Sequence, residues 1–190
     1  MKIVLTGNYD NCKTGNLISI SGDRGKKVNF DGLCLPKLAP KKDFWQVWHD
    51  NIGKISEEEN TEFYVTNYYK EVLSKLDPGE IFDSLPEYSI LLCYEKNMDF
   101  CHRHLVAFWF ELFLEIKTYE VEVKPKRDTL QRLDRPEYLK QILEKVIKEN
   151  YNMNDFNSIS AAYHYNKSKE IEYSYKLELK KNWLKINNKI

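Results

Sequence analysis

The sequence predicts an α/β fold with a mainly parallel sheet of about four or five strands, helices on both faces, and a C-terminal extension of one helix and one strand. Three consecutive segments carry this prediction. Residues 90–94 are an apolar run, short enough for a strand buried on both faces. Residues 105–114 form a longer apolar run typical of a buried helix, and residues 119–123 alternate apolar and acidic side chains. Strand, helix and strand at this spacing indicate a right-handed crossover in a parallel sheet.

Two further strands are expected near the N-terminus. Residues 2–9 contain a buried apolar run, and residues 17–21 form a second strand. Between them, residues 11–15 are rich in Asn, Thr and Gly, which favours a turn. Residues 43–49 then form a short amphipathic helix, because Phe, Val and Trp recur on one side.

A longer helix is predicted over residues 56–76. Ser56 and Glu59 have the spacing of a capping box, in which each side chain bonds the backbone of the other. Apolar residues recur at intervals of three and four along this segment. The sequence Asp-Pro-Gly at 77–79 ends the helix, and residues 81–85 add one more turn.

The C-terminal third differs from the rest in charge. Residues 1–123 carry 14 basic and 20 acidic side chains, a net of −6, whereas residues 124–190 carry 15 and 9, a net of +6. A charged linker over 124–132, a helix over 135–150 and a strand over 171–179 are expected there. We interpret this basic extension as packing on the acidic body. The alternative is an arm that binds nucleic acid.

Composition bears on which partners the protein binds and in which cellular compartment it lies. Lys+Arg and Asp+Glu both number 29, so the whole chain shows no bias toward nucleic acid or membrane. No apolar run reaches the roughly 18 residues that a membrane span needs. The four cysteines are not preceded by a signal peptide, so we expect a cytoplasmic protein without disulfides.

The candidate site lies where the strand at 90–94 passes into the helix that follows. Asp99 is expected to cap this helix, which places Cys101, His102 and Arg103 in its first turn. Unpaired N–H groups and the helix dipole make that turn attractive to anions, and an arginine adds a bidentate donor. Ligands of parallel α/β sheets bind outside the carboxyl ends of the strands, which is where this corner lies.

Each candidate residue has an expected role in this corner. Glu95 is the general base or hydroxyl acceptor, His102 the proton carrier, and Cys101 a candidate nucleophile. The residues expected to bind the anion or substrate are Arg24, Arg103, His104 and Tyr9. Cys101 and His104 are three apart and would share a helix face, whereas adjacent helical residues such as Cys101 and His102 point about 100° apart and pair poorly.

Other interpretations of the same residues stay open. Cys93, Cys101, His102 and His104 have the side-chain types of a zinc site, but the two cysteines are far apart in sequence and there is no second pair. We therefore expect no metal and no cofactor. Cys93 would be a small buried hydrophobe, like Cys12 and Cys34. His104 would be a core histidine, and Glu95 would pair with an arginine.

Two segments around the corner resemble a known family. Leu92-Cys-Tyr-Glu-Lys and Phe100-Cys-His-Arg-His-Leu-Val are similar to the signature of the domain-of-unknown-function-488 family of small bacterial, archaeal and phage proteins. The resemblance covers roughly residues 1–123 and implies an α/β domain there, with 124–190 as an added extension. It departs from the family at Leu5-Thr-Gly-Asn, where the family has a histidine, and around Arg24, which an insertion displaces.

The sequence supports two hypotheses about function. The first is an enzyme acting on a phosphate-bearing small molecule, such as a nucleotide or nucleoside derivative, at the corner formed by Glu95 and residues 101–103. The second is a non-catalytic module that senses such a ligand or binds nucleic acid through the basic extension. The anionic small molecule is the partner expected in the first case, and no membrane partner is expected in either.

Overall fold

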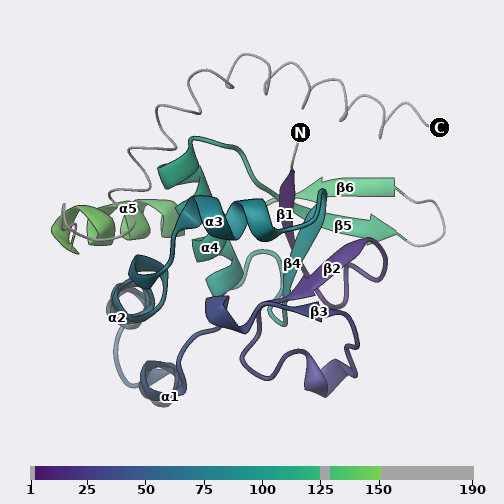
Figure 1. Ribbon diagram of the computed structural model, residues 1–190. Helices are drawn as coiled ribbons and strands as arrows, with labels where there is room; N and C mark the ends of the chain where they lie inside the picture. The colour runs from purple at the N-terminus through teal and green to yellow at the C-terminus, as the bar shows by residue number, and fades with distance from the viewer. Residues whose placement is uncertain (1–2, 125–128, 151–190) are drawn as a thin grey trace.

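A six-stranded sheet forms the centre of the molecule (Figure 1). The structure, a computed structural model, describes residues 3–124 and 129–150. All neighbouring strands are parallel except β5 and β6, which are antiparallel. In spatial order the strands are β3 (Leu33–Cys34), β2 (Asn16–Ser19), β4 (Ser89–Cys93), β1 (Val4–Asn8), β5 (Tyr119–Lys124) and β6 (Thr129–Leu133). The predicted α/β class with a mainly parallel sheet is confirmed.

Five α-helices accompany the sheet in the described part of the chain. They are α1 (Lys42–Asn51), α2 (Glu57–Glu71), α3 (Pro78–Ser84), α4 (His102–Leu114) and α5 (Tyr138–Asn150). The predicted capping box is present at α2, where Ser56 Oγ accepts from the Glu59 backbone N–H and the Glu59 carboxylate accepts from the Ser56 N–H. Short 3-10 turns occur at Lys26–Val28, Pro36–Leu38 and Leu73–Lys75.

The described helices all pack on one face of the sheet, which corrects the prediction of helices on both faces. One core cluster joins Val4, Ile18 and Leu91 of the strands to side chains from all five helices. The cluster on the other face contains Leu5, Ile90 and further strand and loop residues, but no residue of a described helix. Consecutive residues of β1 (Val4, Leu5) and of β4 (Ile90, Leu91) thus contribute to opposite faces, because successive side chains of a strand point to opposite sides of the sheet.

Strand order explains this arrangement. The connections from β3 to β4 and from β4 to β5 both run in the same direction across the sheet, and these two contain α1 to α4. Right-handed crossovers that run in one direction place their helices on one face. The connection from β1 to β2 runs the opposite way, but residues 9–15 are too few to form a helix, so this stretch covers the second face as a loop.

The region after residue 123 agrees with its prediction in one element and differs in another. The helix predicted over 135–150 is present as α5, but residues 129–132, the end of the expected charged linker, form β6 together with Leu133 and pair with β5. Helix α5 contributes Leu139, Leu143 and Val146 to the main core, so this core continues past residue 123. The strand predicted over 171–179 lies outside the described residues, as does most of the basic extension. No helix in the described ranges combines the length and the apolar character that crossing a membrane requires.

Candidate functional site

The corner between β4 and α4 is built as a strand, a loop and a helix, as predicted. Strand β4 ends at Cys93, and α4 begins at His102. The N-cap is Cys101, whose backbone is extended (φ −156°, ψ 143°), so the prediction that Asp99 caps the helix is wrong by two residues. Cys101 therefore precedes the helix, so the direction of its side chain relative to His102 and His104 does not follow from helical spacing.

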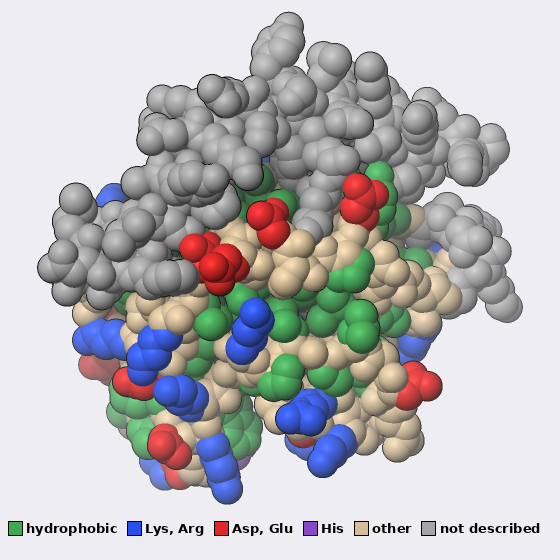
Figure 2. All heavy atoms as spheres, in the orientation of Figure 1, with side chains coloured by type: hydrophobic (Ala, Val, Ile, Leu, Met, Phe, Trp, Pro, Cys, Tyr) green, Lys and Arg blue, Asp and Glu red, His purple; other side chains and the backbone are tan. Residues whose placement is uncertain are grey.

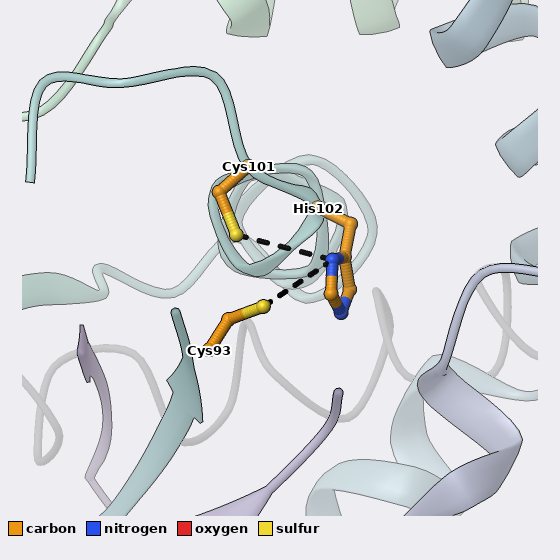
Figure 3. A group of neighbouring side chains, drawn as sticks. All are labelled: Cys93, Cys101 and His102. Atoms are coloured by element: carbon orange, nitrogen blue, oxygen red, sulfur yellow. Dashed lines mark hydrogen bonds between the residues drawn. The ribbon is translucent and has the colours of Figure 1, made fainter. Parts of the chain in front are cut away.

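Cys93, Cys101 and His102 meet at this corner, and we call them the corner cluster (Figure 3). The His102 Nδ1 atom lies 3.7 Å from Cys93 Sγ and 3.9 Å from Cys101 Sγ. The three donor atoms all lie within 4.8 Å of one another. All three residues are buried on the helical side of the sheet. The three side chains thus converge on one point from a strand end and a helix start.

The other nitrogen of His102 fixes the orientation of the ring. Its Nε2 lies 2.9 Å from the backbone oxygen of Ile20, and because a carbonyl only accepts, Nε2 carries a hydrogen and donates it. Nδ1 is then the atom available to hold a proton or a metal ion between the two sulfurs. Tyr68 packs edge-on against the imidazole, with ring centroids 5.7 Å apart.

The electrostatics of the two cysteines differ. Burial raises the pKa of the Cys93 thiol well above its ordinary value. Burial also opposes ionisation of Cys101, but a hydrogen bond with Cys93 and the positive charges of Arg103 and His102 outweigh it and lower the pKa of Cys101. The cluster therefore favours one thiolate beside His102.

Glu95 lies in the loop next to this cluster. It is half-buried, and its Oε2 atom is buried with no hydrogen-bond partner among the described residues. Burial, followed by the nearby charge of Cys101, raises its pKa to about 7. A buried carboxylate oxygen without a donor is costly unless a proton or a cation accompanies it.

Arg103, predicted to bind an anion, is instead fully buried in an internal ion pair. Its Nη2 and Nε donate to the Glu120 carboxylate at 3.0–3.3 Å, and Nη2 also donates to the Lys96 carbonyl at 2.8 Å. Thr6 Oγ1 donates to the same carboxylate at 2.7 Å. The charge of Arg103 is thus largely compensated inside the protein.

The structure does not bring Arg24 and Arg103 together. Arg24 is exposed in the loop after β2, with a left-handed backbone (φ 61°), and its carbonyl lies 3.8 Å from the Cys34 sulfur of the edge strand β3. Arg103 pairs with Glu120 of β5, and β2, β4 and β1 lie between those two strands. These two guanidinium groups therefore do not face one common site.

His104 and Tyr9 also lie away from the corner cluster. His104 is fully buried, with Nδ1 3.8 Å from Glu120 Oε2. Burial and then Arg103 lower its pKa to about 3, so this imidazole is neutral. His102, and not His104, faces Cys101, because Cys101 lies outside the helix whose spacing the prediction assumed. Tyr9 lies on the helix-free face, where its hydroxyl contacts Ser19 Oγ at 2.6 Å and Ser21 Oγ at 3.0 Å.

Two residues of this region were not among the predicted site residues, although Cys93 was considered as one member of a zinc set that was not expected. Cys93 was expected to be a buried hydrophobe, and Glu120 one acidic member of an alternating strand. For Cys93 the available signal was its position as the last residue of a strand that leads directly into the Cys-His corner. For Glu120 the signal was weaker: a buried arginine requires an acidic partner, but the sequence does not say which one.

Comparisons with protein-family models, with curated proteins and with solved structures found no match. The resemblance of residues 1–123 to the domain-of-unknown-function-488 family therefore stays a prediction. The functional argument depends on the geometry of the corner cluster and its surroundings.

Proposed function

We propose, in place of the sequence-based expectation of no metal, that this chain is a metal-binding protein whose corner cluster holds a thiophilic divalent cation, with Zn²⁺ as the best fit. The observation that carries the proposal is the approach of two cysteine sulfurs, at 3.7 and 3.9 Å, to one imidazole nitrogen. A tetrahedral zinc site with Zn–S of about 2.3 Å and Zn–N of about 2.0 Å places sulfur and nitrogen about 3.5 Å apart. The donor types and their spacing both suit zinc.

The surroundings of His102 support the same assignment. A histidine that ligates a metal usually donates its second ring N–H to a carbonyl or carboxylate, which fixes the ring. The Ile20 carbonyl has this role at 2.9 Å. The site draws its parts from the ends of β2 and β4 and from the start of α4, so the bound ion would join three segments.

Glu95 would act as a base beside an exchangeable fourth position, since its carboxylate is not among the three donor groups that lie within 4.8 Å of one another. Three protein ligands and one open position are typical of catalytic zinc, where the metal activates a bound water. A carboxylate close to that position is placed to accept the proton of this water. Two cysteines, one histidine and a nearby glutamate are also the groups used by zinc-dependent nucleobase deaminases, although this chain lacks their sequence motif, so the parallel is an analogy.

Metal titration tests the proposal directly. The reduced full chain should bind one equivalent of Zn²⁺, and Co²⁺ should give the visible bands of a tetrahedral site together with a thiolate-to-metal band. Cys93→Ser, Cys101→Ser and His102→Gln should each weaken binding by more than 100-fold, since removing a second-shell partner alone costs about 10–100-fold.

Cys12→Ser is the matched control, because Cys12 is also buried but lies on the other face of the sheet. It should bind Zn²⁺ like the unmodified chain. Absence of stoichiometric binding to the reduced chain, or equal binding by Cys93→Ser and Cys12→Ser, contradicts the proposal.

A second candidate function is turnover or sensing of a phosphate-bearing small molecule at this edge of the sheet. One observation favours it: the loop after β2 carries the exposed residues Arg24, Lys26 and Lys27, and Lys27 lies 5.6 Å from the ring of Tyr94 at the corner. On the face drawn in Figure 2, Lys and Arg side chains gather over the lower half, where α1 and β3 lie in Figure 1.

Thermal-shift measurements with nucleotides test this second candidate. Arg24→Ala should reduce a nucleotide-induced shift, whereas Lys148→Ala, which removes an exposed charge on α5, should leave it unchanged. If the protein is an enzyme, Glu95→Gln should abolish turnover and retain nucleotide binding. A nucleotide shift that is identical in Arg24→Ala contradicts a role for the basic loop.

A further inference from the structure

We infer that Cys93 and Cys101 form a reversible dithiol–disulfide pair whose oxidation releases the metal, an inference that rests on the proposed metal-binding function. The corner cluster would then bind zinc in its reduced form and close into a disulfide when a peroxide reaches it. The pair consists of two cysteines with only seven residues between them, one at the end of β4 and one at the N-cap of α4.

The first support is distance. The two sulfurs lie within 4.8 Å of one another and on the same side of the His102 ring. A disulfide requires an S–S separation of about 2.05 Å, so the sulfurs must approach by less than about 3 Å. The inference requires rotation of one side chain and a small shift of its backbone to close this distance.

The second support is that the two cysteines are joined by a loop, residues 94–100. Cys101 is the N-cap of α4: its carbonyl accepts from the His104 backbone N–H at 3.1 Å, but its backbone is not helical and its side chain makes no capping bond. Residues 94–100 form a loop of turns and bends, and Lys96, Met98 and Asp99 in it are exposed. This loop can adjust without breaking the sheet, whereas Cys93 is held by the pairing of β4 with β1.

The other two cysteines are not placed to compete. Cys12 lies on the helix-free face, where its sulfur contacts the Val121 carbonyl at 3.3 Å. Cys34 is exposed on the edge strand β3. Intramolecular closure is therefore specific to Cys93 and Cys101, and Cys34 is the cysteine that would link two molecules.

The chemistry balances with hydrogen peroxide as the oxidant. One cysteine thiolate attacks a peroxide oxygen, the O–O bond breaks, and the products are a sulfenic acid and hydroxide, which takes up a proton to become water. The second thiolate then attacks the sulfenic sulfur, forms the S–S bond and expels hydroxide, which is protonated to a second water. Two thiols and one peroxide become one disulfide and two waters. One of the two thiolate electron pairs that ligated zinc has passed to the peroxide and the other forms the S–S bond, so the metal loses both anionic ligands and leaves.

The experiment uses the full chain with Cys34→Ser, which prevents intermolecular links. The metal-free reduced protein is treated with one equivalent of hydrogen peroxide, alkylated and mapped by mass spectrometry. We expect a peptide cross-linked between Cys93 and Cys101 with a loss of two hydrogens, and an alkylated Cys12. In parallel, zinc-loaded protein is treated in the same way and released zinc is followed with a chromogenic chelator. One zinc should be released per disulfide, and dithiothreitol should restore binding.

The outcomes separate this inference from the proposed function. If the reduced protein binds zinc but peroxide yields only sulfinic acids or a link that involves Cys12, the inference is overturned and the metal site stands. If the cross-link forms while the reduced protein binds no zinc, the dithiol pair stands without its metal, and both the proposed function and the coupled release fail. Cys12→Ser with Cys34→Ser should behave like Cys34→Ser alone, and any loss of the cross-link in that variant counts against the inference.

Discussion

Arg103 and Glu120 form an ion pair in the protein interior, and both side chains are fully buried. Burial raises the pKa of Glu120 and the charge of Arg103 opposes that rise. Thr6 and the Lys96 carbonyl add further hydrogen bonds to the pair, while Arg103 Nη1 is buried with no hydrogen-bond partner among the described residues. The pair therefore joins β1, β5 and the start of α4 directly beside the corner cluster.

Replacing one partner should be far more costly than replacing both. Arg103→Met leaves a buried carboxylate without its counter-charge, which typically costs about 3–5 kcal/mol of stability. Arg103→Met combined with Glu120→Gln should recover most of that loss, because the amide still accepts from Thr6. Urea unfolding measures both. Arg24→Ala, in an exposed loop, should change the free energy of unfolding by less than about 0.5 kcal/mol. If the single Arg103→Met variant were as stable as the unmodified chain, the ion pair would not contribute to the stability of the fold.

At the scale of elements, the loop from β1 to β2 depends on a close approach to Gly7. A Cβ atom at this position would lie 2.6 Å from Cys12 Sγ and 3.1 Å from the Val121 carbonyl oxygen. The loop returns across the face of the sheet at this point, and any larger residue would push it away. The helix-free face is thus closed by a short segment packed tightly on glycine.

Gly7→Ala should lower the free energy of unfolding by roughly 1–3 kcal/mol, the usual cost of inserting a methyl group into a packed interior. Gly22→Ala is the matched control, since a Cβ there meets no atom within 4 Å. Chemical unfolding should give a clearly lower free energy of unfolding for Gly7→Ala than for Gly22→Ala. Equal stability of both would mean that the loop moves aside without cost.

A second link between elements is Glu111 of α4. Its carboxylate accepts from Arg135 at 2.7 Å and from Lys140 at 2.8 Å, and it also accepts from Thr118 at the start of β5. Burial opposes its ionisation, but these partners outweigh burial and lower its pKa. Because the folded pKa is depressed, the stabilisation is present above the unfolded value of about 4.3 and is lost as the pH falls through the folded pKa.

Glu111→Gln should therefore destabilise the protein at pH 7 by on the order of 2 kcal/mol, as expected for hydrogen bonds to charged groups. It should also flatten the loss of stability on acidification below about pH 4.3. Glu149→Gln, at an exposed position of α5, should reproduce the acid sensitivity of the unmodified chain. Unfolding free energies measured from pH 7 to pH 3 decide the question, and parallel curves for Glu111→Gln and the unmodified chain would contradict the assignment.

For the whole molecule, a bound metal would couple the corner cluster to global stability. The cluster connects β4 of the central sheet to α4 of the main core, and His102 also donates to the carbonyl of Ile20, directly after β2. A ligand that binds only the folded state stabilises it by about 4 kcal/mol at a concentration 1,000 times its dissociation constant.

Zinc should therefore raise the melting temperature of the reduced chain, and a chelator should reverse the rise. Cys93→Ser should remove the response, whereas Cys34→Ser, at an exposed edge, should keep it. Differential scanning calorimetry on the full chain provides the measurement. A rise of the same size in Cys93→Ser would assign the effect of zinc to another part of the molecule.

The sequence by itself determined the fold class, most of the elements and the location of the corner. Apolar periodicity is a local property, so the strands at 4–8, 89–93 and 119–124 and the helix after Cys101 could be predicted from it. The hairpin strand β6 was missed because its two leucines are too few to give a clear alternation beside the charged residues before it, and because it lies at the edge of the described sheet, next to β5.

Only the tertiary structure decided which side chains meet. Whether Arg103 faces solvent or Glu120 depends on contacts between residues far apart in the sequence, and no local pattern encodes them. The same holds for Cys93 and His102, which converge because β4 ends where α4 begins and because the Ile20 carbonyl orients the imidazole. Strand order in turn placed α1 to α4 on one face, since the direction of each right-handed crossover is a property of the whole sheet, and α5, which follows β6, packs on the same core.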